Sequence, residues 1–265
     1  MVELRDVSYH AGDVRILNDV SVCFRPHRFN VILGPNGAGK STLLRIATGL
    51  LRPSGGEVRY DGRAVSAFDP IAFARTRAVL SQHVELAFAL PVQDVVMMGR
   101  YPHFGRAPSK RDREIVERAL ELVEMTHKRH QPYPTLSGGE RQKVQLARVL
   151  AQIWNHDEPG EHKYLFLDEP TTSLDIHYQL HLLDVARALC DRNCTVVAVL
   201  HDLNVAFQYG DSFFLVNGGR IVHETDCAEG ISAELIEQVF RVRAVEEGGM
   251  WRFGSRAAGS LLTRG

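Results

Sequence analysis

The sequence predicts an α/β fold: a parallel sheet with helices, an N-terminal antiparallel β subdomain and an inserted α-helical subdomain. Apolar runs at 30–33, 164–167 and 195–200 read as buried strands, and each of them ends in glycine or polar residues. Alternating apolar residues precede the first run, and amphipathic helical segments follow Gln82. A chain of 265 residues is long enough to bury such a core.

Composition narrows the class of protein. The formal net charge is −1, so no global field favours nucleic acid or anionic lipid, and we expect no nucleic-acid partner. No apolar stretch approaches the roughly 20 residues that span a bilayer, and residues 1–6 lack an apolar leader. The chain is therefore expected to stay on the cytosolic side. The 4 scattered cysteines suggest no disulfide framework, although Cys190 and Cys194 leave a redox pair open.

The elements follow from periodicity and turn signals. We expect strands at 2–9, 20–24, 30–33, 56–60, 77–82, 164–168 and 195–200, a hairpin at 213–224, and helices at 43–51, 91–99, 111–125, 138–150, 176–189 and 232–240. Prolines at 102, 108, 132 and 134 punctuate the region after Gln82, which marks it as a helical insertion.

A glycine-rich turn joins the strand at 30–33 to the helix that follows it. The turn matches G-x-x-x-x-G-K-[ST] with Gly34, Pro35, Asn36, Gly37, Ala38, Gly39, Lys40, Ser41 and Thr42. Its backbone N–H groups and the positive helix end suit phosphate oxygens. Lys40 is expected to reach the β- and γ-phosphates, and the Ser41 hydroxyl to ligate Mg²⁺. The sequence therefore predicts a site for a nucleoside triphosphate.

A second phosphate cradle is indicated further along the chain. Ser137 with Glu140 three residues later forms a capping box at the start of a helix. Gly138 and Gly139 follow the cap and leave the helix mouth free of side chains. The two cradles need not face each other within one molecule, which suggests a site shared between two molecules.

Two buried strands end in groups suited to phosphate chemistry. The strand at 164–167 is followed by Asp168, which can hold Mg²⁺, and by Glu169, which can act as a general base for water. The strand at 195–200 ends at His201, at the sheet edge where open α/β sheets bind ligands. His177 and His181 have a zinc-like spacing but no third ligand nearby, so we interpret them as surface residues.

Taken in order, these motifs resemble the ATP-binding subunit of an ABC transporter. The resemblance is carried by the phosphate loop, Gln82 after a strand, the segment 136–142, Asp168-Glu169, Asp175 and His201. It implies a P-loop NTPase (RecA-like) core. Residues 1–84 and 160–225 would form the nucleotide-binding core with its β subdomain, 85–159 the helical subdomain and 226–265 a C-terminal extension.

The resemblance also implies how the site works. Two subunits would sandwich two ATP molecules head to tail, with the phosphate loop of one facing Ser137, Gly138 and Gly139 of the other. Asp168, Ser41 and Gln82 would hold Mg²⁺. Glu169 would polarise water, His201 and Gln82 would sense the γ-phosphate, and Asp175 would bridge the dimer. The chain departs from the family pattern at Ala11, where an aromatic residue usually stacks on adenine; Tyr9 and His10 stand just before it.

Within the family, the segment 77–103 is similar to importers of metal chelates, and the haem (hemin) importers are nearest. The resemblance then implies haem uptake at the cytoplasmic face of the bacterial inner membrane, with two transmembrane permease subunits and, indirectly, a periplasmic binding protein. Ferric-siderophore or cobalamin import is the alternative. A soluble ABC ATPase of DNA repair or translation is the less favoured alternative, because such proteins usually carry long coiled-coil insertions or two cassettes in one chain, and this sequence shows neither. A P-loop kinase or GTPase would leave 136–142 unexplained.

Overall fold

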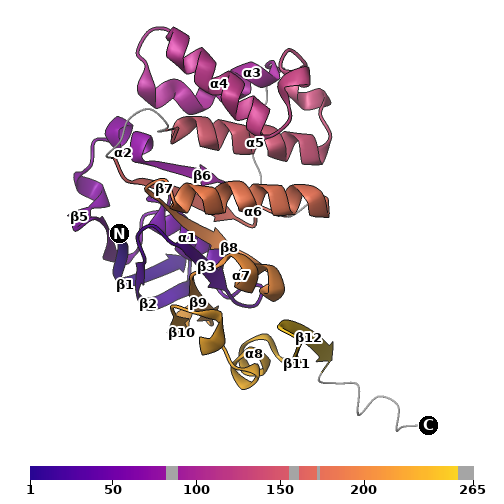
Figure 1. The fold of residues 1–265 in the computed structure, drawn as a ribbon. Coiled ribbons are helices and arrows are strands. Elements are labelled where there is room, and N and C mark those ends of the chain that lie inside the picture. Colours follow the sequence, from indigo (N-terminus) through magenta and orange to yellow (C-terminus); the bar gives the residue numbers. More distant parts are fainter. Residues whose placement is uncertain (82–88, 155–160, 172–173, 256–265) are drawn as a thin grey trace. The chain divides into compact units, whose positions relative to one another are not determined.

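The computed structural model describes residues 1–81, 89–154, 161–171 and 174–255. The chain forms two compact units, which Figure 1 draws as a ribbon. Unit 1 consists of residues 1–62 and 199–265, and unit 2 of residues 63–198. This division differs from the domain limits expected from the sequence, which stay a prediction, and each unit is described by itself.

Unit 1 combines both ends of the chain. Its elements are β1 (Val2–Ala11), β2 (Val14–Phe24), β3 (Phe29–Leu33), α1 (Lys40–Ala47), β4 (Gly55–Tyr60), α7 (Leu203–Tyr209), β9 (Ser212–Asn217), β10 (Arg220–Thr225), a 3₁₀ turn (Ala228–Gly230), α8 (Ala233–Phe240), β11 (Val242–Glu247) and β12 (Met250–Ser255). β2, β1 and β4 pair antiparallel, which confirms the predicted β subdomain. β3 pairs in parallel with β9, and β9 forms the predicted hairpin with β10.

The core of unit 1 buries β3, the strand that precedes the phosphate loop. All five residues of β3 are buried, as expected for a strand with both faces covered. Ile32 of β3 is opposite Phe214 of β9, and the Phe214 ring meets Phe24 of β2 edge-on at 5.1 Å. The Tyr60 hydroxyl donates to the Ala47 carbonyl at 2.8 Å, which ties β4 to the end of α1.

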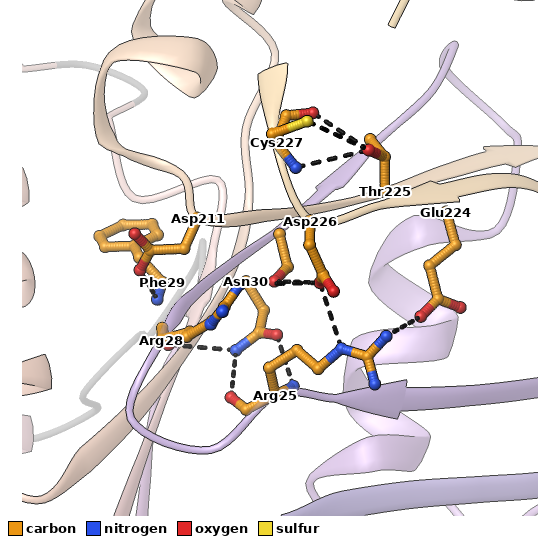
Figure 2. A network of polar contacts seen from close by, with 10 residues as sticks. Arg25, Arg28, Phe29, Asn30, Asp211, Glu224, Thr225, Asp226 and Cys227 are labelled. Carbon is orange, nitrogen blue, oxygen red and sulfur yellow. Dashed lines mark hydrogen bonds and ion pairs between the residues drawn. The ribbon is translucent and has the colours of Figure 1, made fainter. Parts of the chain in front are cut away.

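A polar network fixes the turn between β2 and β3 (Figure 2). The buried Asn30 side chain accepts from the Arg25 backbone N–H at 2.7 Å and donates to the Arg25 carbonyl at 2.9 Å. The Arg25 guanidinium bonds Asp226 at 3.1 Å and Glu224 at 3.2 Å, and Asp226 also accepts from Ser212 Oγ at 3.0 Å. Exposed ion pairs stabilise little, so the buried Asn30 amide is the main support of this turn.

The C-terminal region contains a hairpin that the sequence analysis missed. α8 lies where a helix was expected, with Ser232 as its N-cap. β11 and β12 then pair across Gly248 and Gly249, both at positive φ (61° and 79°). The Asn204 side-chain oxygen of α7 accepts from the Trp251 N–H at 2.7 Å, and its Nδ2 donates to the Trp251 carbonyl at 3.1 Å. The hairpin is therefore anchored to α7.

Unit 2 holds the helical insertion and the second group of parallel strands. Its elements are β5 (Arg63–Ala64), α2 (Pro70–Thr76), β6 (Arg77–Leu80), α3 (Val92–Met97), α4 (Lys110–Leu122), α5 (Gly138–Gln152), β7 (Lys163–Asp168), α6 (Ile176–Cys190), β8 (Cys194–Val199), and 3₁₀ turns at Val65–Ala67, Met98–His103, Thr126–Lys128 and Tyr133–Thr135. The strand order is β8, β7, β6, and β6 pairs with β7 in parallel.

The helices of unit 2 pack on one another through apolar faces. α3, α4 and α5 lie against each other, drawn in magenta to rose in Figure 1, which confirms the predicted helical subdomain. α4 begins at the Ser109 capping box and buries Ile115, Val116 and Leu120 on one side. The expected helix at 91–99 is shorter than predicted, because the segment from Met98 to His103, which contains Pro102, turns as a 3₁₀ helix.

Candidate functional site

Steric limits account for the glycines of the phosphate loop. Gly34 has φ 151°, and a Cβ there would lie 2.1 Å from the Val216 carbonyl oxygen of β9. Gly39 has φ 100°, and its Cβ would lie 2.9 Å from the Leu17 side chain. A larger residue at either position would strain the backbone and collide with a packed neighbour. The loop therefore lies directly against β9 and β2.

The Lys40 side chain lies back over the loop. Its ammonium donates to the carbonyls of Gly34 at 2.8 Å and Pro35 at 3.0 Å, and the residue is only 5% exposed. Lys40 is also the first residue of α1, and Gly39 at the N-cap has no side chain to accept from the first N–H groups. The positive helix end and the ammonium are thus gathered at one loop, as anion binding requires.

The turn between β9 and β10 supports the loop from behind. The Gly219 N–H donates to the Ala38 carbonyl at 3.1 Å, and the Gly219 carbonyl accepts from the Asn18 N–H at 2.9 Å. A Cβ on Gly219 would lie 2.3 Å from the Ile16 carbonyl oxygen. The sequence analysis read residues 217–219 only as a hairpin turn. The glycine pair was the available signal, but the contact with the loop is not visible in the sequence.

His201 is placed in unit 1 beside the strand that precedes the loop. The residue before it, Leu200, donates its N–H to the Ile32 carbonyl of β3 at 3.4 Å. The residue after it, Asp202, caps α7 by accepting from the Asn204 N–H at 2.8 Å. The position of exposed His201 is thus fixed by its two neighbours.

In unit 2, Asp168 and Glu169 stand at the end of a buried strand. Every residue of β7 is buried, and Asp168, its last residue, is 8% exposed. Glu169 has φ 50°, a left-handed backbone conformation that residues other than glycine rarely adopt. The next carbonyl, that of Pro170, accepts from Gln142 Nε2 of α5 at 2.6 Å. This hydrogen bond joins the acidic turn to the helix that starts at the second cradle.

The predicted capping box at the start of α5 is confirmed. The Glu140 carboxylate accepts from the Ser137 N–H at 3.0 Å, and Ser137 Oγ accepts from the Glu140 N–H at 3.4 Å. Lys128 also donates to Glu140, and this bond lowers the pKa of Glu140 to about 2. Glu140 is therefore held as a carboxylate, which fixes the cap geometry at neutral pH.

Gly138 differs from the loop glycines. Among the described residues, no atom lies within 4 Å of a Cβ built on Gly138. Neither packing within the chain nor a left-handed backbone explains a glycine here. The open helix mouth leaves room for a group from outside the chain, as expected for a cradle that receives a phosphate.

The structure gives different results for the remaining residues that the sequence singled out. Asp175 caps α6 by accepting from the Tyr178 N–H at 2.9 Å, so it has a local role in addition to the dimer bridge expected from the resemblance. Gln82 lies outside the described residues. His181 Nε2 bonds the Leu122 carbonyl at 2.6 Å. The described part of the chain holds no cluster of three metal-ligating side chains, and all four cysteines are free thiols.

The phosphate loop and His201 thus belong to unit 1, whereas Ser137 to Gly139, Asp168, Glu169 and Asp175 belong to unit 2. In the ranges the structure describes, none of the helices combines the length and the apolar character needed to cross a bilayer.

Comparison with known proteins gives one consistent result. Residues 17–172 match the family model described as ABC transporter. The hemin import ATP-binding protein HmuV of Agrobacterium fabrum is 41% identical over 92% of this chain and 93% of its own length. HmuV of Gloeobacter violaceus is 46% identical over 78% and 75%. A solved dimeric cassette of a bacterial ABC transporter is 28% identical, with a TM-score of 0.72 over 85% of this chain and 98% of that one.

The matched residues include the phosphate loop, the Ser137 cradle and the strand end at Asp168-Glu169. The chain belongs to the ABC transporter family and is one of its nucleotide-binding ATPases.

Proposed function

We propose that this chain is the ATP-binding and hydrolysing subunit of a bacterial importer that takes up haem. Relatives 38% to 46% identical carry the name hemin import ATP-binding protein, and they match along most of the chain. The cargo does not touch an ATPase subunit, so haem is inferred from these relatives and from the segment 77–103. The catalytic machinery is inferred from the chain's own residues.

The observation that carries the proposal is the open mouth of α5. A Cβ built on Gly138 would meet no packed atom within 4 Å among the described residues, while Gly34 and Gly39 are required by packing inside the chain. Because no contact within the chain requires glycine at this position, the missing side chain is best explained by a ligand that approaches the backbone from outside the chain. We assign that approach to ATP held on the phosphate loop of a second copy. The dimeric form of the related cassette supports the same arrangement.

We assign one role to each catalytic residue. Lys40 and the amides of Gly34 to Thr42 hold the β- and γ-phosphates. Glu169 polarises the attacking water as general base, and His201, with Gln82, contacts the γ-phosphate. Asp175 bridges the dimer while also capping α6.

The donor set fits Mg²⁺. Ser41 contributes a hydroxyl beside the loop, Asp168 contributes a carboxylate at the end of a buried strand, and Gln82 contributes an amide oxygen. Oxygen donors of this kind are the ligands that Mg²⁺ takes when it is bound with a nucleotide. Bound Mg²⁺ neutralises charge on the phosphate oxygens.

The partners follow from the same proposal. Two copies of this chain bind two transmembrane permease subunits at the cytoplasmic face of the inner membrane, and a periplasmic protein delivers the cargo. The chain is peripheral to the membrane in this arrangement. ATP closes the dimer and hydrolysis reopens it, because the γ-phosphate is the contact that both copies share.

The dimer proposal is tested by Gly138→Ala, with Gly105→Ala as its matched control. A Cβ at Gly105 also meets nothing within 4 Å, and Gly105 lies outside both cradles. We expect both variants to fold and to bind ATP as monomers with wild-type affinity. Only Gly138→Ala should lose ATP-dependent dimerisation, measured by light scattering in a Glu169→Gln background. Equal dimerisation of the two variants would contradict the shared site.

The cargo is tested with the purified permease complex in vesicles. ATP hydrolysis should be stimulated by binding protein loaded with haem, and haem should accumulate inside. Stimulation by a ferric siderophore or cobalamin, without a response to haem, would overturn the choice of cargo and leave the ATPase assignment intact.

A further inference from the structure

A polar cavity of about 300 Å³ lies in unit 2, beside α2, the start of α4 and the start of β7. This volume is at the lower end of the range for small-ligand sites. The lining includes four cations, Arg75, Arg100, Arg111 and Lys163. Two carboxylates, Asp112 and Glu161, offset them only in part. The excess of positive charge makes the cavity suitable for an anion.

Two of the cations are buried. The Arg100 side chain is 7% exposed and bonds Asp112 at 3.0 Å and the Ala151 carbonyl at 2.7 Å. Asp112 also accepts from the Ser109 N–H and hydroxyl, so this carboxylate is already fully engaged. The Lys163 side chain is 8% exposed and bonds Glu161 at 2.7 Å. A buried ammonium needs such a partner, because burial without one is costly.

Glu161 already acts as an anion bound by this cavity. Its pKa is lowered by the hydrogen bond from Lys163 and further by the charges of Lys163 and Arg75. The Glu161 side chain is nevertheless 73% exposed, and only its carboxylate reaches the ammonium. An exposed side chain can turn into solvent at little cost, so a better anion can replace it at Lys163.

A neutral acceptor lies among the cations. His103 Nε2 bonds the Gln152 carbonyl at 2.7 Å, and since a carbonyl only accepts, this nitrogen carries the proton. Burial and the nearby Arg100 lower the pKa of His103 to about 4, so the ring is neutral at pH 7. Nδ1 is then a lone-pair acceptor, and it has no hydrogen-bond partner among the residues the structure describes. It favours an oxyanion that still carries a proton.

We propose that this cavity binds a phosphate group that keeps one proton, as monohydrogen phosphate or as the singly protonated form of a phosphate monoester. The buried Lys163 and the exposed Arg75 and Arg111 hold its charged oxygens, and His103 accepts from its P–OH. Lys163 is the first residue of β7 and Asp168 is the last. The length of the strand, about 17 Å, therefore separates the cavity from the catalytic carboxylates. The site is independent of the proposed transport function.

The test is calorimetric titration of inorganic phosphate into the full-length Lys40→Ala variant, which weakens phosphate binding at the nucleotide loop. Arg111→Gln and Arg75→Gln should each weaken the remaining binding at least tenfold. Glu161→Gln should tighten it, since the competing carboxylate is gone. The matched control is Arg113→Gln on the exposed side of α4, outside the lining, and it should change nothing.

The choice of anion tests the protonated oxygen. Sulfate has the shape and charge of phosphate but no proton at pH 7, so it should bind at least tenfold more weakly. Glycerol phosphate, a soluble phosphate monoester, is titrated at pH 6, where about half of it keeps one proton, and distinguishes a monoester site from a site for free phosphate. No phosphate binding in Lys40→Ala, sulfate binding as tight as that of phosphate, or a weaker affinity in Glu161→Gln would each overturn the proposal.

Discussion

The side-chain amide of Gln142 donates a 2.6 Å hydrogen bond to the carbonyl of Pro170. Gln142 is in the first turns of α5, just after the Ser137 cradle, and Pro170 directly follows Glu169. One bond therefore connects the part of unit 2 that would receive a partner's nucleotide with the part that carries Glu169, the proposed general base. The helix and the acidic turn can be expected to move together.

Gln142→Leu should therefore reduce turnover more than binding. We expect ATP affinity to stay within about twofold and kcat to fall about tenfold, since Glu169 loses support for its left-handed backbone. Gln142→Glu keeps the length but cannot donate, so it should behave like Gln142→Leu. Steady-state kinetics with Gln93→Leu as a control checks this. Full activity of Gln142→Glu would show that the bond is dispensable.

Glu169→Gln should bind ATP, hold the closed dimer and lose turnover by roughly 10²-fold or more, as expected when a general base is removed. Single-turnover hydrolysis and size-exclusion chromatography with ATP measure the two effects. Asp191→Asn, an exposed acidic position beyond α6, is the control. Turnover near that of the wild type would remove Glu169 from its assigned role.

Lys40→Ala should weaken nucleotide binding itself. The ammonium that bonds the Gly34 and Pro35 carbonyls is the group expected to bond phosphate, and a charged hydrogen bond contributes about 1.5–3 kcal/mol. ATP affinity should fall roughly tenfold to a hundredfold in a direct titration. An unaltered affinity would show that Lys40 stays folded back on the loop.

Gly34→Ala should destabilise the fold, unlike Gly138→Ala. The new methyl group would meet the Val216 carbonyl oxygen at 2.1 Å from a backbone at φ 151°. Strain and overpacking together should lower the free energy of unfolding by about 2–5 kcal/mol. Urea unfolding of both variants provides the comparison. A stable Gly34→Ala variant would show that the loop can move away from β9.

His103 should make stability depend on pH. The pKa of His103 is lowered from 6.5 to about 4, chiefly by burial. Between these two pH values His103 is therefore mostly protonated in the unfolded chain and mostly neutral in the folded chain. Stability should therefore fall by on the order of 1–3 kcal/mol as the pH drops from 6.5 to 4. His103→Gln keeps a donor for the Gln152 carbonyl and should flatten this part of the urea-unfolding profile. An unchanged slope would contradict the assignment.

The local motifs could be predicted because each depends on neighbours in sequence. The phosphate loop, the Ser137 capping box and the strand ending at Asp168 are visible as spacing, and the structure places all three as expected. The second role of Asp175 was missed, although an aspartate three residues before Tyr178 is an ordinary N-cap signal.

The long-range supports could not be predicted. Gly219 bonds Ala38, 181 residues earlier in the chain, and packs against Ile16, 203 residues earlier. The 2.1 Å distance from a Cβ at Gly34 to the Val216 carbonyl oxygen likewise joins segments far apart in sequence. The hairpin of β11 and β12 was missed for another reason. Its strands are mostly exposed and lack a regular alternation, so only the Gly248-Gly249 turn marked it. Pattern analysis detects burial, and there is little burial in this hairpin.

The anchoring of the β11–β12 hairpin on α7 provides a natural optical probe. The chain has 2 tryptophans, Trp154 and Trp251. The Trp251 backbone makes two hydrogen bonds with the side chain of Asn204, which lies three residues beyond His201. Trp154→Phe leaves a single indole, whose emission reports the environment at the start of α7. If His201 contacts the γ-phosphate as proposed, a change in this emission on ATP binding would report it in real time without an attached dye.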